Sequence, residues 1–318
     1  MADFGPRFRG LARATAESRM GGFLRKRAMS KDARVESRFT SGQAVAAGVK
    51  NLGSSDFLAQ YGPSSGVDTF YVLGSGSSVN KLTLNQFEEI ATQRSVGINT
   101  WAVHPFVPSF YCFESVPWVG DGRDFYRSLS LLKRDDIVHR DPAILILRPK
   151  KSSEFQALTE VPRELHPNIH FYGRVTPATR NRVNLLDDID YFFESLVTKH
   201  PGLVLDSGAS VVRMVALGII LGFRKIVLVG VDLNGSPYFW EQQSELVQNL
   251  GEIRPANNQE GMFHETTMAH GRAFGVVTML EQLDIYLRTC EKGQLFVESR
   301  DSVLSHFLPL YLWRPGIV

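Results

Sequence analysis

A glycine-serine segment stands directly after an apolar, β-prone run in this sequence. The run is Thr69–Leu73, and it leads into Gly74, Ser75, Gly76, Ser77 and Ser78. Glycines allow a sharp turn and a close backbone approach to a ligand, while serine hydroxyls and backbone N–H groups can bind phosphate or sugar oxygens. Neither a Walker loop nor a complete dinucleotide G-x-G-x-x-G pattern is present. The segment predicts either a ligand-binding turn or an ordinary structural turn.

A second candidate site begins at Ser207 and Gly208, just ahead of a helix expected over residues 209–221. The first turn of a helix carries free N–H groups and a partial positive charge, which suit a phosphate or a carboxylate. Ser207 would serve equally well as a plain helix N-cap. Both interpretations remain open from the sequence.

A third turn follows the run at residues 226–230, the most strand-like in the chain. Asp232 ends this run, and the turn at residues 234–237 brings Tyr238 above the expected sheet edge. The Tyr238 hydroxyl could donate to a phosphate, or the side chain could simply lie on the surface.

Two histidines precede the long helix expected at residues 273–291. An imidazole that titrates near neutral pH can accept a proton from an alcohol, so His264 and His270 are the candidate general bases, with His264 favoured. Solvated histidines would have the same pattern. Met268 replaces the second histidine of a zinc-binding H-E-x-x-H motif, and we expect no metal.

These turns are linked by an alternation of short strands and helices. Such alternation predicts a doubly wound, Rossmann-like α/β fold with a mostly parallel sheet flanked by helices. Ligands of such sheets bind beyond the carboxyl ends of the strands, near the reversal of strand order. All three turns should lie along that edge. We expect a single domain over residues 66–318, with a lid at about residues 232–263.

Residues 1–65 differ from the rest and are expected to form a basic, loosely ordered or peripheral arm. The basic residues after Arg7 are Arg9, Arg13, Arg19, Arg25, Lys26, Arg27, Lys31, Arg34 and Arg38, against three acids. A solvated arm is the simplest interpretation. Attraction to anionic lipid, at about 1 kcal/mol per basic residue, and docking to a partner chain are alternatives.

The composition excludes several other classes. A net charge of +2 argues against nucleic acid as a partner. Two distant cysteines, Cys112 and Cys290, argue against a disulfide framework and fit a reducing compartment. Neither a signal peptide nor a membrane-spanning run is recognisable. We therefore expect a cytoplasmic protein, peripheral to the inner membrane if the arm binds lipid.

Together these segments resemble the bacterial sialyltransferases of glycosyltransferase family 42. The matching pieces are residues 71–78, 96–99, 207–208, 221–232 and 234–238, followed by His264, the long helix and residues 301–304. The resemblance implies a single GT-A-like nucleotide-binding domain. It also implies an inverting, metal-independent transfer of sialic acid, or a related 2-keto sugar acid, from a CMP-linked donor to a glycan hydroxyl. It implies no cofactor besides the donor substrate, and cell-envelope polysaccharide or lipooligosaccharide as the setting.

The same resemblance implies roles for individual residues. Gly74, Ser75, Gly76 and Ser78 would hold the CMP portion, Asn99 would contact the nucleotide or donor sugar, and Ser207 and Gly208 would support the donor. Tyr238 would bind the leaving phosphate and His264 would be the base. Asp232 is taken as donor-binding from its position.

Two departures from the family pattern bear on the donor. Leu233 stands where a phosphate-binding tyrosine is expected, and Glu114 stands where sialyltransferases have an asparagine. A Glu114 carboxylate would repel a donor carboxylate. The alternatives are another nucleotide-linked or phosphorylated substrate on the same scaffold, or a non-catalytic nucleotide-sugar-binding module. A homo-oligomer is compatible with either.

Overall fold

The structure, a computed structural model, describes residues 6–98, 100–114, 128–243 and 273–314. Within these ranges nine strands form one sheet, and every strand pairing in it is parallel. The strands are β1 (Lys50–Asn51), β2 (Thr69–Leu73), β3 (Arg94–Ile98), β4 (Phe110–Phe113), β5 (Ala143–Leu147), β6 (Ile169–Val175), β7 (Leu203–Leu205), β8 (Lys225–Val229) and β9 (Gln294–Val297). The expected α/β fold with a parallel sheet is confirmed.

The order of the strands reverses beside β2. From β2 the chain adds β3, β4, β5 and β6 in one direction, and β1 and β7 both pair with β6 at that edge. The chain then returns to place β8 on the other side of β2, followed by β9. The carboxyl ends of β2 and β8 therefore flank the point of reversal, where doubly wound sheets bind ligands.

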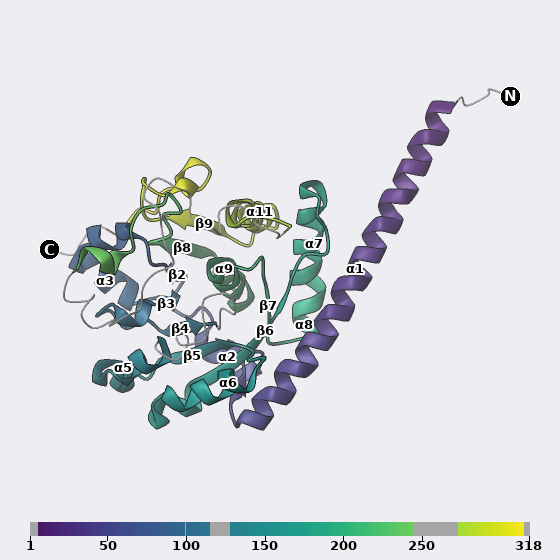
Figure 1. Cartoon of the computed structure of the whole chain (residues 1–318). Coiled ribbons are helices and arrows are strands. Elements are labelled where there is room, and N and C mark those ends of the chain that lie inside the picture. Colours follow the sequence, from purple (N-terminus) through teal and green to yellow (C-terminus); the bar gives the residue numbers. More distant parts are fainter. Residues whose placement is uncertain (1–5, 99, 115–127, 244–272, 315–318) are drawn as a thin grey trace.

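Helices cover both faces of the sheet (Figure 1). The α-helices whose bounds lie within the described residues are α1 (Pro6–Ala47), α2 (Ser55–Tyr61), α3 (Leu84–Ala91), α5 (Asp135–Arg140), α6 (Ser152–Gln156), α7 (Leu185–Tyr191), α8 (Val197–Lys199), α9 (Ser210–Leu221) and α11 (Val276–Thr289). A π-helical turn at Phe192–Leu196 joins α7 to α8. None of the helices in the described ranges is long and apolar enough to cross a membrane.

The strands divide their side chains between two cores. In β5, Ala143 and Leu145 face the core under α9 and α11, whereas Ile144 and Ile146 face the core under α3 and α5. Adjacent strand residues point to opposite faces, so a strand covered on both sides must be apolar at every position. This is why the continuous runs in β2, β5 and β8 were recognisable in the sequence.

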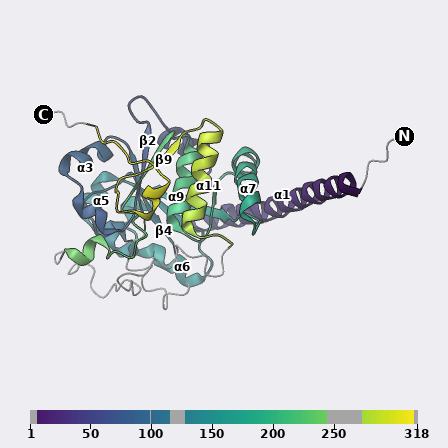
Figure 2. The same cartoon turned by 90° about the horizontal axis from the view of Figure 1, so that it is seen from above.

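The N-terminal arm differs from the expectation of a loosely ordered segment. Residues 6–47 form the single helix α1, and its second half packs against β1, β6, β7 and α7. Figures 1 and 2 both show the N-terminal half of α1 extending beyond the rest of the chain. Met29, Ala33, Thr40 and Ala44 are buried on the packed side. Small residues dominate this stripe, so α1 lacks the strong apolar periodicity that identifies an amphipathic helix.

One glycine permits the close docking of α1. A Cβ atom placed on Gly173 of β6 would lie 2.6 Å from Thr40 Oγ1, 2.7 Å from Leu203 Cδ2 and 2.8 Å from Glu36 Cγ. Glu36 also accepts a bidentate pair of hydrogen bonds from Arg148, at 3.0 and 2.7 Å. The second half of α1 is thus an integral part of the fold.

Candidate functional site

The glycine-serine bend lies at the strand reversal, in close backbone contact with the loop after β8. The Gly74 N–H donates to Val229 O and the Gly76 N–H to Gly230 O, each at 2.7 Å. A Cβ on Gly74 would lie 2.5 Å from Gly230 O, and one on Gly76 would lie 2.3 Å from Asp232 Oδ2. Both glycines are therefore required by close packing of the two loops.

Ser78 and Asp232 lock these loops together. The Ser78 hydroxyl donates to Asp232 Oδ1 at 2.6 Å, and the Ser78 N–H donates to Asp232 Oδ2 at 3.0 Å. Glu298, directly after β9, comes within 3.2 Å of the same hydroxyl and accepts from the Gly230 N–H at 3.3 Å. Ser78 and Asp232 were predicted to bind the donor, and in the structure both hold the bend in shape.

The Glu298 carboxyl has an unusual ionisation. Burial, together with the nearby charge of Asp232, raises the pKa of Glu298 to about 7, although the Gly230 N–H and the Ser78 hydroxyl act in the opposite direction. A carboxyl group that titrates near neutral pH at a strand reversal is the type of group that active sites use. Sequence reasoning missed Glu298 because nothing in its local pattern marks it.

Tyr238 lies next to the bend. Tyr238 and Gly76 form an antiparallel bridge, and the Phe239 N–H donates to Ser75 O at 3.0 Å. The Tyr238 ring is half-buried and stacks on Trp240 with centroids 4.5 Å apart. The Ser75 hydroxyl oxygen is buried and has no hydrogen-bond partner among the described residues. The structure thus brings Gly74, Ser75, Gly76 and Tyr238 together.

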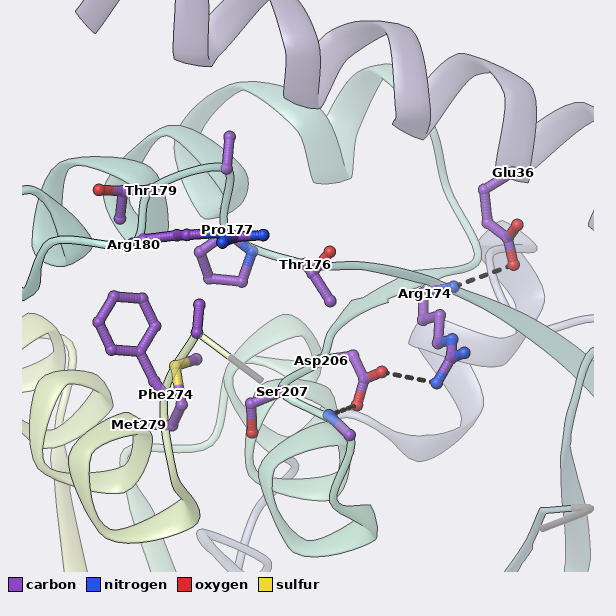
Figure 3. A pocket seen from close by; sticks show the side chains of 13 residues that line it. Glu36, Arg174, Thr176, Pro177, Thr179, Arg180, Asp206, Ser207, Phe274 and Met279 are labelled. Carbon is purple, nitrogen blue, oxygen red and sulfur yellow. Dashed lines mark hydrogen bonds and ion pairs between the residues drawn. The ribbon is translucent and has the colours of Figure 1, made fainter. Parts of the chain in front are cut away.

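A cavity of about 590 Å³ lies beyond the carboxyl ends of β6 and β7 (Figure 3). Its size is typical of a site for a small molecule. The residues that line it are Glu36, Arg174, Thr176, Pro177, Ala178, Thr179, Arg180, Asp206, Ser207, Gly208, Ala273, Phe274 and Met279. Figure 3 shows Arg180, Phe274 and Met279 at one end and Glu36 and Arg174 at the other. The cavity combines an apolar wall with charged and hydroxyl groups.

Ser207 and Arg180 are two polar groups of the cavity that have unused hydrogen-bonding capacity among the described residues. Ser207 is 9% exposed, and its hydroxyl oxygen has no partner among the described residues. It lies three residues ahead of α9, so it is not the cap of that helix, which begins at Ser210. Arg180 is exposed at the rim and makes no ion pair within the described ranges.

The remaining charges of the cavity are compensated. Asp206 accepts from Arg174 at 2.9 Å, from Arg213 at 2.6 Å and from the Gly208 N–H at 2.7 Å. Burial alone would raise the pKa of Asp206, but Arg213 and Arg174 lower it below its usual value. Asp206 is therefore an ionised, fixed carboxylate beneath the cavity.

Arg213 links this region to Glu114 at the end of β4. The fully buried Arg213 guanidinium contacts Glu114 Oε2 at 2.5 Å, and the Ser210 hydroxyl donates to Glu114 Oε1 at 2.5 Å. The carboxylate of Glu114 is thus neutralised by a neighbouring cation. Arg213 interrupts an otherwise apolar helix, which is the one sequence signal that could have revealed this network; Arg174 and Arg180 have no such signal.

The predicted residues form two groups along one edge of the sheet. The bend, Asp232 and Tyr238 meet at the strand reversal, whereas Ser207 and Gly208 line the cavity and Glu114 pairs with Arg213. Asn99, His264, His270 and residues 244–263 of the expected lid lie outside the described residues. Among the described residues, no three His, Cys, Asp or Glu side chains lie close enough together to hold a metal ion.

Fold and site define a doubly wound α/β protein with its candidate binding groups at the carboxyl edge of a parallel sheet. No family model matches the chain, and no curated protein matches it. Among solved structures, it is similar to the MAf glycosyltransferase from Magnetospirillum magneticum AMB-1, with 15% identity and a TM-score of 0.42. The match covers 79% of this chain, which spans about a third (34%) of that protein.

Proposed function

We propose that this protein is an inverting glycosyltransferase that moves an acidic sugar from a CMP-linked donor to a glycan hydroxyl. The observation that carries the proposal is the cavity next to α9, in which neither the buried Ser207 hydroxyl nor the Arg180 guanidinium has a partner among the described residues. A sugar acid offers the complementary groups, namely one carboxylate and several hydroxyls. The resemblance of the bend and of residues 221–232 to family 42 supports a CMP donor.

The cavity and the bend would divide the donor between them. The carboxylate of the sugar would bind Arg180, the Ser207 hydroxyl and the N-terminal end of α9, because a guanidinium and free N–H groups both favour an anion. Sugar hydroxyls would donate to Asp206, and the apolar face of the ring would pack on Phe274. The cytidine and phosphate would lie at the bend, beside Ser75 and Tyr238.

The chemistry would be a direct displacement. An acceptor hydroxyl oxygen would attack the anomeric carbon while the bond to the phosphate oxygen breaks, and the acceptor proton would pass to His264 or His270. Fixed hydrogen-bond donors such as Tyr238 would stabilise the charge that develops on the departing phosphate. No step in this scheme requires a metal.

The environment of Glu114 removes one objection to an acidic donor. A bare carboxylate at the end of β4 would repel the carboxylate of the sugar. Glu114 is instead paired with Arg213 and accepts a hydrogen bond from Ser210. Its field is largely cancelled at short range by the adjacent cation, so it is compatible with an anion in the cavity.

A thermal-shift panel tests the donor. We expect CMP to raise the melting temperature, and the CMP-linked sugar acid to raise it further, because a ligand that binds only the folded state stabilises it. UDP, GDP and their sugars should have no comparable effect. A shift with UDP or GDP but not with CMP would contradict the donor assignment, and saturable binding without transfer or donor hydrolysis would contradict the enzymatic role.

A variant of Arg180, with a matched control, tests sugar binding in the cavity independently of nucleotide binding at the bend. Arg180→Gln should weaken binding of the CMP-linked sugar acid by about tenfold or more, since a lost charge-assisted hydrogen bond costs roughly 1.5–3 kcal/mol. Its affinity for CMP alone should not change. Arg163→Gln is the matched control, because Arg163 is exposed and lies outside the cavity. Equal losses in both variants would argue against the assigned role of Arg180.

A further inference from the structure

The basic residues of α1 fall into two sets with different surroundings. Arg25 pairs with Asp188 at 3.2 Å, and Lys26 lies 5.3 Å from the ring centroid of Tyr191, so these two hold α1 to the domain. The second set is exposed and makes no ion pair or hydrogen bond with any described residue; it consists of Arg27, Lys31, Arg34 and Arg38.

The second set lies on one face of the helix. Positions 27, 31, 34 and 38 follow the three- and four-residue spacing that aligns side chains along a helix. The buried residues Met29, Ala33, Thr40 and Ala44 lie on the opposite side. The basic face therefore points away from the sheet.

Apolar side chains interleave with this basic face. Met20, Phe23, Leu24 and Val35 are 63%, 64%, 56% and 46% exposed, which is unusual for such residues. Met20 and Leu24 continue the stripe of Arg27 and Lys31 towards the N-terminus, and Val35 is one turn beyond Lys31. Between Met20 and Ala47 the acids are Asp32 and Glu36, and Glu36 is occupied by Arg148 on the packed side.

We propose that this outward face of α1 binds an anionic lipid surface. A helix that lies in a membrane interface combines Lys and Arg with apolar side chains, which are buried at the boundary between headgroups and acyl chains. Unpaired basic residues at such a surface gain from the negative potential of the lipid. A second copy of this chain would instead bring four unpaired cations against four others, so charge favours lipid over self-association.

Vesicle co-sedimentation of the full chain tests the proposal. We expect binding to vesicles of phosphatidylcholine that carry phosphatidylglycerol, and much weaker binding to phosphatidylcholine alone. Binding should decrease as salt is added, because exposed charges are screened within about 3 Å at 1 M ionic strength. Equal binding to both kinds of vesicle, or none to either, would overturn the proposal.

Paired variants locate the surface. Arg27→Glu/Lys31→Glu and Arg34→Glu/Arg38→Glu should each weaken partitioning into anionic vesicles by about tenfold or more, at unchanged melting temperature. The control Arg140→Glu/Arg163→Glu makes the same change in net charge at exposed positions away from α1, and should retain binding. Equal loss in the control would mean that net charge, and not this face, is responsible.

Phe23→Ser/Leu24→Ser addresses the apolar part of the face. We expect weaker partitioning that salt does not restore, since burial of apolar area is not screened. Sedimentation in the absence of lipid should show the same mass for this variant and the natural chain. A dimer that the same substitutions dissociate would assign the face to self-association and overturn the lipid proposal.

Discussion

The guanidinium of Arg213 and the carboxylate of Asp206 lie 2.6 Å apart, and both side chains are sealed from solvent. Arg213 belongs to α9, and Asp206 directly follows β7, so this pair fixes the helix against the end of the strand. The same guanidinium binds Glu114 beyond β4. One buried cation therefore holds α9 against the ends of both β7 and β4.

Replacing Arg213 with methionine should be strongly destabilising. The substitution leaves the half-buried Glu114 without a cation and the buried Asp206 with only the partly exposed Arg174, and breaking a buried pair costs about 3–5 kcal/mol. Chemical denaturation should detect a loss of that size in the free energy of unfolding. Arg174→Met is the matched comparison, because Arg174 is partly exposed, and it should cost much less. A loss below about 1 kcal/mol for Arg213→Met would contradict this account.

Glu298 should make the protein less stable as the pH rises. Its pKa is about 7 in the folded chain against an ordinary value of 4.5, so between these pH values the folded state holds a proton that the unfolded state has released. The contribution of Glu298 to stability must then fall across this window, by up to about 3 kcal/mol. Burial lowers the pKa of His104 and of His170 to about 4, so these two groups contribute the opposite slope up to about pH 6.5, and the effect of Glu298 is the difference between the natural chain and a Glu298 variant. Melting temperatures from pH 4.5 to 7.5 measure the effect.

Glu298→Gln should remove most of that pH dependence and should be at least as stable as the natural chain above pH 7. Glu164→Gln, at an exposed position, should leave the pH dependence as it is. If both variants retain the slope, another group must be responsible for it.

Gly76→Ala should open the contact between the bend and the loop after β8. The new methyl group would lie 2.3 Å from Asp232 Oδ2, so the Asp232 carboxylate or the bend must move. We expect a loss of about 1–3 kcal/mol in stability and a weaker thermal shift with CMP. Gly42→Ala is the control, since nothing lies within 4 Å of its Cβ position, and it should stabilise α1 by about 1 kcal/mol. Unchanged CMP binding in Gly76→Ala would show that the bend does not bind the nucleotide.

Gly173→Val should loosen α1 from β6. Even a single Cβ would meet Thr40 and Glu36 at less than 3 Å, and a branched side chain cannot be accommodated without displacing the helix. Limited proteolysis should cleave within residues 28–47 faster in this variant than in the natural chain. Equal cleavage rates would show that the helix adapts to the added volume.

Replacing each of the two candidate bases, His264 and His270, should affect turnover but not nucleotide binding. His264→Ala should abolish transfer while leaving the thermal shift with CMP intact, and His270→Ala should retain most of the activity. Measuring both quantities on each variant separates a base from a binding residue. The reverse pattern would make His270 the base. Full activity in both variants would exclude both imidazoles as the general base.

Much of the fold could be predicted because buried strands leave a clear signal. The ranges of β2, β4, β5, β7 and β9 coincide with apolar runs bounded by turns, and α9 ends at Leu221 as predicted, before Gly222 with a φ of 90°. The π-helical turn at Phe192–Leu196 could not be predicted, because the sequence pattern of residues 185–200 indicates one continuous helix. Local pattern specifies an element's type better than its internal geometry.

The site was harder to predict because its partners are distant in sequence. Ser78 and Asp232 are both polar residues after strands, but only the strand order shows that they lie close enough to hydrogen-bond each other. The same limit applied to Arg180, which enters the cavity from the loop after β6. α1 escaped detection because its packing stripe is made of small residues such as Ala33 and Ala44.

α1 both lines the cavity, through Glu36, and carries the outward basic face. The Glu36 carboxylate lines the cavity, while Arg34 and Arg38, two residues away on either side, face outward. A helix with its side chains is about 10–12 Å thick. With the outward face resting on a bilayer, the helix would act as a spacer that holds the mouth of the cavity a single helix diameter above the headgroups. Acceptors carried on short lipid-linked stems would then be within reach of the cavity. Long chains that are free in solution would not become more accessible when the protein binds the membrane.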